Sequence, residues 1–220
     1  MDSGQNVSYG ICLAQGRPSM FKLRQQTGYS LIEILVVVGI IGVVSVIAVP
    51  LFGNLVANLR VTGDARGMAN SLAVAKMRAA SNFSRARIYV DLAARQYYLQ
   101  SWDKEATAGA GGWVTEGGTT YLSSGVDFSY SPVTTPPPNT QGAIAQSVEC
   151  TADDGAAIAG SACIMFNSRG VPVDTTFAPT GSSGLYITDG MEVYGVTIAS
   201  TGMLRSWHTR PTVVPNWMLH

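Results

Sequence analysis

The chain has 220 residues, enough for one globular domain of ordinary size and an appendage. Only 13% of the residues are charged and the net charge is zero, so no overall basic field directs the protein to nucleic acid. Most of the 24 glycines and 10 prolines lie beyond residue 100, which favours a turn-rich β domain over a helical one.

A basic start precedes a long apolar run. Lys22 and Arg24 come shortly before 26 uncharged residues, Ile34 to Leu59. About 20 helical residues, each rising ~1.5 Å, cover the ~30 Å hydrocarbon core of a bilayer. The run therefore predicts one membrane-spanning helix. By the positive-inside rule its N-terminal end is expected in the cytoplasm and the rest of the chain across the membrane.

Two other interpretations of the apolar run are weaker. A core helix of a soluble protein is rarely this long and this uniformly apolar. A secretory signal peptide should end in a small-residue cleavage site, and "IAVPLFGN" is a poor one. The helical pattern also continues beyond the run, so an ordinary signal peptide is not expected.

Residues 28–50 read "GYSLIEILVVVGIIGVVSVIAVP". This stretch resembles the N-terminal methylation motif of type IV pilins and type II secretion pseudopilins: a Gly, an aromatic, a small polar residue, two aliphatics and a Glu, then an apolar helix. The resemblance implies that a prepilin peptidase cuts between Gly28 and Tyr29 and methylates the new amino terminus of Tyr29. Glu33 matches the glutamate of that family, and Pro50 matches its helix-kinking proline.

A carboxylate in a spanning segment needs a partner, because an unpaired charge there is costly. Cleavage after Gly28 would create a positively charged amine on Tyr29, about one helical turn before Glu33. The two groups can pair within one subunit. In a filament, the resemblance implies that Glu33 draws in the Tyr29 amine of a neighbouring subunit. The stretch from Leu31 to Leu55 is then the expected assembly surface, loosened locally by Pro50.

The expected leader is longer than such leaders usually are, because 28 residues precede the cut. Met20 begins "MFKLRQQTG", which alone would be a typical basic leader. Translation is therefore expected to start at Met20, with a long-leader variant as the alternative. The expected division is a leader over 1–28, a helix over 29–83 that spans the membrane at about 31–55, and a head domain over 84–220.

The helical pattern continues past the apolar run to about Asn82. Apolar residues three or four apart form one narrow stripe that is expected to pack on the head. Its members are Val61, Ala65, Met68, Leu72, Ala75, Ala79 and Phe83. The opposite flank is basic, with Arg60, Arg66, Lys76, Arg78, Arg85 and Arg87. We interpret this basic flank as a solvated face; contact with acidic filament neighbours or lipid head groups is the alternative.

From Ala86 the apolar period changes to two, and "RARIYVDLAARQYYLQSW" predicts a β-hairpin. Further strands are predicted within 125–131, 163–170, 184–189, 191–200 and 202–210. Loops are expected at Thr107–Gly118 and Ser131–Gly142, which are rich in Gly and Pro respectively. The fold class is therefore α+β, a long N-terminal helix packed on an antiparallel β-rich head. The resemblance to pilins implies that this head is β-sandwich-like and of the pilin type.

Cys150 and Cys163 flank a loop of small residues in "ECTADDGAAIAGSAC". Outside the cytosol such a pair favours a disulfide, because the loop is otherwise poor at ordering itself. Two unrelated buried thiols are the alternative. Cys12 lies alone in the expected leader.

Two later stretches, "CIMFNSRGVPV" and "YGVTIASTGMLRSW", resemble the paired end motifs of the GspH/FimT family of minor pseudopilins and minor pilins. Some members bind DNA through a "GRxR" turn. Here the corresponding residues are Gly202, Met203, Leu204 and Arg205, so the first arginine is missing. Arg205 and Arg210 remain as candidate DNA or partner contacts, but so few cations give only weak affinity for phosphate.

No catalytic arrangement stands out in the sequence. The two histidines, His208 and His220, imply no partner, and Asp153-Asp154 lacks the alternating acidic spacing of a Ca²⁺ loop. Zinc-ligand spacing and a Gly-rich phosphate cradle are also missing. We therefore expect no enzyme, no cofactor and no metal; a single-pass membrane enzyme is the least favoured class.

The expected protein is a minor pilin or pseudopilin of a type IV pilus or type II secretion filament. It would wait in the bacterial inner membrane with its head in the periplasm, then join the filament near the tip and aid assembly and protein secretion. The resemblance implies other pilins, the prepilin peptidase and an inner-membrane assembly platform as partners. A DNA-binding minor pilin for natural transformation is the alternative.

Overall fold

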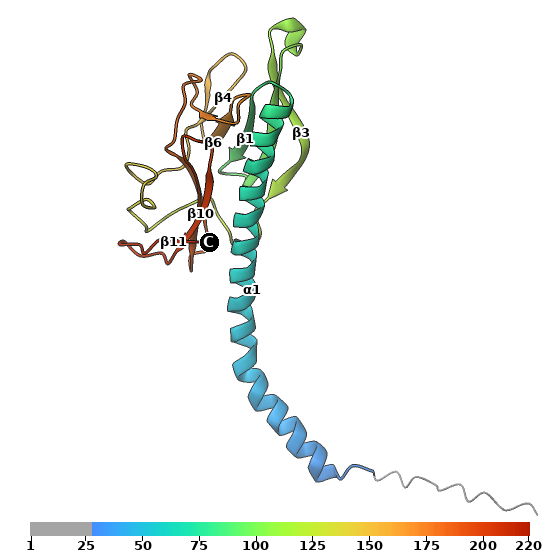
Figure 1. Cartoon of the computed structure of the whole chain (residues 1–220). Coiled ribbons are helices and arrows are strands. Elements are labelled where there is room, and N and C mark those ends of the chain that lie inside the picture. Colours follow the sequence, from blue (N-terminus) through green and yellow to red (C-terminus); the bar gives the residue numbers. More distant parts are fainter. Residues whose placement is uncertain (1–27) are drawn as a thin grey trace, which may run out of the picture. The chain divides into compact units, whose positions relative to one another are not determined.

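The computed structural model describes residues 28–220, so the expected leader, the start at Met20 and Cys12 lie outside the described residues. The first element is a single long helix, α1 (Leu31–Ser81), and the strands follow it (Figure 1). The described residues divide into two compact units, one that ends at Val46 and one from Ile47 to His220, and α1 contributes to both.

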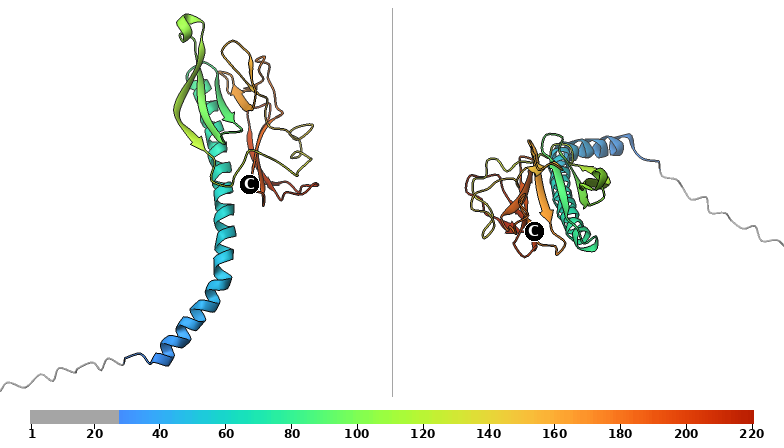
Figure 2. Two further views of the ribbon diagram at one scale, coloured as in Figure 1. Left: turned by 180° about the vertical axis from the view of Figure 1, so that it is seen from behind. Right: turned by 90° about the horizontal axis from the view of Figure 1, so that it is seen from above.

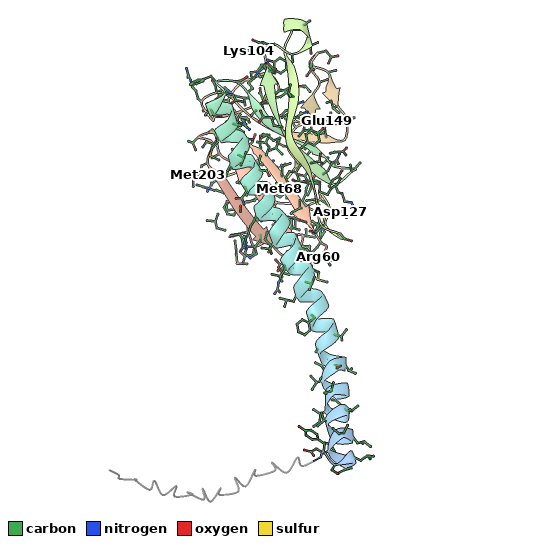
Figure 3. The ribbon with its side chains drawn as sticks, turned by 90° about the vertical axis from the view of Figure 1, so that its right-hand side faces the viewer. Arg60, Met68, Lys104, Asp127, Glu149 and Met203 are labelled. Atoms are coloured by element: carbon green, nitrogen blue, oxygen red, sulfur yellow. A yellow bond between two sulfur atoms is a disulfide. The ribbon has the colours of Figure 1, made fainter. Side chains whose placement is uncertain are left out.

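In the first unit, α1 begins after Ser30, whose carbonyl oxygen accepts a hydrogen bond from the amide of Ile34 (3.2 Å). Every residue of the helix from Leu31 to Val46 is exposed. Side chains project from this stretch on both sides in Figure 3, and nearly all of them are apolar. An apolar surface that runs all the way round a helix is typical of a helix surrounded by lipid or by other helices.

In the second unit, α1 buries one stripe against the head. Its members are at most 1% exposed: Val61, Ala65, Met68, Leu72, Ala75 and Ala79. Met68 lies where α1 passes the strands (Figure 3). The predicted spacing of the stripe is therefore confirmed for six residues. The prediction is wrong for the seventh, Phe83, which is 82% exposed.

Phe83 leaves the stripe because α1 has already ended at Ser81. The amide of Ser84 donates to the carbonyl oxygen of Ala79 (3.2 Å), and the amide of Phe83 donates to that of Ala80 (3.3 Å). This pair of bonds is a Schellman cap, in which one residue adopts a left-handed conformation. Phe83 holds that position with φ of 48°, which a glycine usually occupies.

The head contains two main antiparallel sheets and a small third one. The first, sheet A, has the strand order β3-β2-β1-β6-β7: β3 (Gly112–Tyr121), β2 (Gln96–Asp103), β1 (Ala86–Asp91), β6 (Ser161–Phe166) and β7 (Pro172–Val173). Sheet B has the order β11-β10-β9-β8: β11 (Met218–Leu219), β10 (Leu204–Thr209), β9 (Val193–Ile198) and β8 (Ser183–Thr188). The pair β4 (Cys150–Thr151) and β5 (Ala157–Ile158) forms the third sheet, and a 3-10 turn, η1, covers Thr107–Gly109.

One hydrophobic core joins α1 to both main sheets. Alternate residues of three strands face the α1 stripe: Ala86, Ile88 and Val90 from β1; Leu185 and Ile187 from β8; Tyr194, Val196 and Ile198 from β9. The second half of α1 runs alongside these strands in both side views (Figures 1 and 2). The expected α+β fold, a long helix packed on antiparallel sheets, is confirmed.

The β-hairpin predicted from Ala86 is present as β1 and β2, with Tyr89 opposite Tyr98. Four of the five further strands are also confirmed, as β6, β8, β9 and β10. The strand predicted within 125–131 is wrong: its one ladder contact is a bridge between Asp127 and Thr188. The chain turns directly after that bridge, because the amide of Ser129 donates to the carbonyl oxygen of Asp127 (3.0 Å).

The expected loop at Thr107–Gly118 is also wrong, because most of it belongs to β3. β3 lies at the edge of sheet A and is mostly exposed, so its glycines leave no hole in the core. The register of β3 against β2 shifts between Tyr97 and Leu99, and Gly117 lies in that bulge with φ of 75°. The loop expected at Ser131–Gly142 is confirmed, since it contains no helix or strand.

Candidate functional site

The expected processing position lies just ahead of α1. Gly28, Tyr29 and Ser30 belong to no helix or strand, and all three are exposed. The side chain of Tyr29 is 80% exposed, and a Cβ added to Gly28 would have no neighbour within 4 Å. The Gly28–Tyr29 peptide bond therefore lies in an accessible, non-helical segment, which is the form of chain that a peptidase can bind.

Glu33 lies in the first turn of α1 and is exposed. Ser30 occupies the N-cap position, so the sequence Ser30-Leu-Ile-Glu33 has the S-x-x-E spacing of a capping box. A carboxylate in the first turn also interacts favourably with the helix dipole. In the described residues, however, no side-chain hydrogen bond joins the two residues. The structure thus shows the position of Glu33 in the first turn and the S-x-x-E spacing, without the capping bonds themselves.

The helix that follows is long and apolar enough to cross a membrane. The stretch Leu31–Val49 has a mean hydropathy of 2.9, and none of it is buried. No second helix of this kind occurs in the part of the chain that the structure describes. Pro50 falls within α1, and the kink expected from it stays a prediction.

Residues 23–49 match a family model described as the prokaryotic N-terminal methylation motif. The segment is similar to this methylation motif. The match includes Gly28, Tyr29 and Glu33, and it ends before the head begins. The methylation motif and the exposed apolar stretch of α1 together indicate that the chain is anchored in a membrane.

Comparison of the whole chain with known proteins adds two distant structures. Both are of the minor pseudopilin EpsH from the type II secretion system of Vibrio cholerae. One has 15% sequence identity and a TM-score of 0.42, covering 67% of this chain and 95% of that one. The other has 15% identity and a TM-score of 0.39, covering 70% and 92%. At this level of similarity we base no conclusion on either. Comparison with curated proteins gave no significant match.

Beyond the methylation motif, the two stretches that resemble paired end motifs meet in the head. Gly170 turns the chain between β6 and β7, and Gly202 turns it between β9 and β10, with φ of 71° and 77°. A Cβ added to Gly202 would overlap the carbonyl oxygen of Gly170. Lys76 of α1 reaches this crossing, where its Nζ donates to the carbonyl oxygen of Gly202 (2.9 Å). Lys76 thereby ties both turns to the helix.

The interpretation of the basic flank as a solvated face fits Arg60, Arg66 and Arg78, which are exposed, but is wrong for Arg87, which is buried; Lys76 and Arg85 are half-buried. Several of these side chains also have partners. Lys76 binds Gly202, Arg78 forms an ion pair with Glu116, and the Arg66 guanidinium lies 3.3 Å from the His220 ring. Arg85 and Arg87 follow the end of the helix and stack on aromatic rings of sheet A. These partners come from remote segments, so the helical pattern alone could not reveal them.

The structure does not bring Arg205 and Arg210 together. Arg205 lies within β10 opposite Thr197 and is half-buried, whereas Arg210 follows the strand and is exposed. Five residues of extended strand separate them by roughly 16 Å. The structure therefore does not bring these two cations to one place on the last hairpin.

The two histidines meet although the sequence implied no partner for either. The rings of His208 and His220 lie 5.6 Å apart, and both pack against the ring of Tyr194. Burial lowers the pKa of His220, and the nearby positive charge of Arg66 lowers it further. Within residues 28–220, no group of three or more His, Cys, Asp or Glu side chains could hold a metal ion.

In the structure Cys150 and Cys163 are joined by a disulfide, which fixes the β4–β5 pair to β6. Arg87 lies beneath this pair and is 2% exposed. It donates to the carbonyl oxygen of Thr151 (2.7 Å) and to Oε1 of Gln100 (2.8 Å). Burial lowers the pKa of Arg87 to about 10, so the guanidinium stays charged at neutral pH.

Proposed function

We propose that the chain is a minor pilin or pseudopilin of the GspH/FimT type, a subunit of a type II secretion or type IV pilus filament. The observation that carries this proposal is the methylation motif at residues 23–49. The proposed division is a leader over 1–28, a segment over 29–83 that contains α1 (Leu31–Ser81) with its membrane span at about 31–55, and a periplasmic head over 84–220. The basic leader supports a cytoplasmic N-terminus.

Processing begins with cleavage of the accessible peptide bond between Gly28 and Tyr29 by a prepilin peptidase, which then methylates the new amine of Tyr29. Before cleavage, the uncut leader keeps basic residues at the cytoplasmic end of the helix. Cleavage removes them and leaves one positive amine close to the Glu33 carboxylate. The apolar helix can then move from lipid into a filament without carrying the leader along.

Assembly requires that contacts between helices replace contacts with lipid. The exposed apolar surface of α1 from Leu31 to Val49 offers no packed face within its own chain, so neighbouring subunits are its proposed partners in the filament. Glu33 pairs with the Tyr29 amine of a neighbour in that apolar surrounding, where either charge alone would be very unfavourable. The head, held rigidly to α1 by one core, acts as a structural subunit near the filament tip and carries no catalytic site.

The processing step is tested by determining the mature N-terminus. The full-length chain is produced in membranes together with a prepilin peptidase, and the N-terminal peptide is identified by mass spectrometry. The expected product begins with N-methylated Tyr29. A matched sample with a catalytically inactive peptidase should keep the leader. A chain that retains Gly28 in the presence of active peptidase would refute the proposed processing.

The assembly role of Glu33 can be separated from its role at the helix start. Glu33→Gln keeps a residue that suits the third helical position of a capping box but removes the negative charge, whereas Glu33→Ala removes both. We expect normal cleavage and loss of filament incorporation for both variants, measured by the fraction of subunit in sheared or cross-linked filaments. Normal incorporation of Glu33→Gln would show that the charge pair is not needed.

A further inference from the structure

Arg85 contacts two aromatic rings on the face of sheet A that points away from α1. Its guanidinium carbon is 4.2 Å from the centroid of the Trp102 ring and 4.2 Å from that of Phe177. Trp113 lies edge-on to Trp102, at 5.9 Å from the same guanidinium. A guanidinium that stacks on aromatic rings keeps the N–H groups at its edge available for hydrogen bonds.

Phe177 is held against Arg85 by a strained turn. Its backbone has φ of 65°, which is unfavourable for a side chain with a Cβ, and its side chain is 51% exposed. Asp174 closes the turn: its Oδ1 accepts hydrogen bonds from the amides of Thr176 (2.8 Å) and Ala178 (3.0 Å). The turn thus keeps the exposed Phe177 ring beside Arg85 although its backbone conformation is unfavourable.

Arg85 has no acidic partner within residues 28–220. The two salt bridges there involve Arg78 and Arg95, and the Arg85 guanidinium takes part in no hydrogen bond. Burial lowers the pKa of Arg85, and no neighbouring carboxylate acts against that effect. The contrast with Arg87 is informative, because Arg87 is equally close to an aromatic ring but donates to both Gln100 and Thr151. Arg85 therefore presents unused donors to solvent.

The aromatic surroundings extend along the same face of the sheet. The Tyr89 and Tyr98 rings stack at 4.9 Å, and the Arg87 guanidinium connects them to Trp113. All the aromatic residues involved are only partly buried. We call the following six residues the arginine–aromatic patch: Arg85, Tyr89, Tyr98, Trp102, Trp113 and Phe177. Tryptophan, tyrosine and arginine are the residue types that dominate the binding energy of protein interfaces.

We propose that the arginine–aromatic patch is a docking site for an extended acidic segment of a partner protein, with one carboxylate bound in plane by the Arg85 guanidinium. A guanidinium offers parallel N–H donors that match the two oxygens of a carboxylate, and stacking on aromatic rings leaves those donors free for an in-plane approach. Apolar parts of the same segment would lie on the exposed rings. The patch belongs to the head alone, so the proposal does not depend on filament assembly.

A single unpaired cation favours one carboxylate over a nucleic acid strand. Single-stranded DNA also stacks on aromatic rings, but binding sites for it follow the backbone with a groove of several cations. Here Arg87 is already used within the fold, and Asp153 lies beside the patch, where its Oδ1 accepts the amide hydrogen of Trp113 (2.9 Å). A repeated phosphate backbone would meet this negative charge without further cations to offset it.

The proposal is tested with the full-length chain in detergent and three fluorescein-labelled probes. The first is a short Val- and Ser-rich peptide with a single Glu, the second replaces that Glu by Gln, and the third is oligothymidine. Fluorescence anisotropy should show that the acidic peptide binds most tightly. Arg85→Gln should weaken that binding by about tenfold, because a charge-assisted bidentate contact is lost.

A second variant and a control keep the result clear. Phe177→Gly removes the exposed ring and relieves the backbone strain, so it should fold normally and still weaken binding of the acidic peptide. Arg95→Gln removes an exposed arginine outside the patch and should leave the binding of the acidic peptide unchanged. Unchanged binding by Phe177→Gly, or no loss with a folded Arg85→Gln, would overturn the proposal. Equal binding of the Gln peptide, tighter binding of oligothymidine, or no binding of the acidic peptide would overturn it as well.

Discussion

Gly202 offers a direct test of how the head is fixed to α1. In Gly202→Ala the new Cβ would overlap the carbonyl oxygen of Gly170 and lie 3.2 Å from Nζ of Lys76. Both neighbours are held in place, one in a tight turn and the other by its bond to the carbonyl oxygen of Gly202. The substitution therefore has to displace the crossing of the two turns.

The size of the effect can be assembled from its parts. A left-handed conformation costs a residue with a Cβ about 1–2 kcal/mol, part of which is offset by a less flexible unfolded chain. Overpacking against a rigid neighbour adds about 1–3 kcal/mol, and loss of the Lys76 hydrogen bond adds about 1 kcal/mol. The expected total is about 2–5 kcal/mol, which lowers the Tm by on the order of 10 °C in a domain of this size.

Gly190 provides the matched control. It also has a positive φ, of 84°, but a Cβ added there would have no neighbour within 4 Å. Gly190→Ala should therefore show the backbone cost alone, about 1 kcal/mol or less. Thermal unfolding of the two full-length variants in detergent, followed by circular dichroism, measures the difference. Equal Tm values would refute the conclusion that the two turns and Lys76 form a close-packed crossing.

Three further measurements test separate features. Phe83→Gly should raise the free energy of unfolding by about 0.5–1 kcal/mol, because glycine suits the left-handed cap position and the lost ring is exposed; an unchanged Tm would contradict the cap. Replacing Cys150 and Cys163 together by Ala should lower stability by about 3 kcal/mol in thermal unfolding, and an equal Tm would argue against the disulfide. Because the pKa of His220 is lowered in the folded state, protonation of His220 favours the unfolded chain. The contribution of neutral His220 to stability is therefore complete above about pH 6.5 and is lost as the pH falls below that value. His220→Gln should flatten that decline in unfolding curves measured from pH 7.5 down to about 5; an unaltered slope would exclude a contribution from His220.

The sequence predicts those features that depend on local pattern. The uncharged run after Glu33 predicts the apolar half of α1, and the spacing from Val61 to Ala79 predicts its buried stripe. The alternation after Ala86 predicts the β1–β2 hairpin, because both strands have one face in the core. Each of these patterns extends over many residues, so a single exception does not hide it.

Features that depend on contacts between remote segments could not be predicted. The helical pattern places Lys76 on the solvent side, and only the fold shows that its Nζ donates a hydrogen bond to the carbonyl oxygen of Gly202. In the sequence, the glycines of β3 suggest a loop. Only the fold shows that β3 lies at an exposed sheet edge, where a strand can contain glycines. Phe83 continues the apolar spacing, yet the Schellman cap has already turned the chain there.

The position of Ser30 at the start of α1 has a consequence for the proposed cleavage. Only Tyr29 would remain ahead of the cap, so the new ammonium group would lie beside the first free amides of the helix. The partial positive charge at that end would repel it and favour loss of its proton. Glu33, one turn further on, supplies the negative charge that counters both effects. The Glu33 carboxylate would thus keep the Tyr29 amine protonated until that amine pairs with Glu33 of a neighbouring subunit.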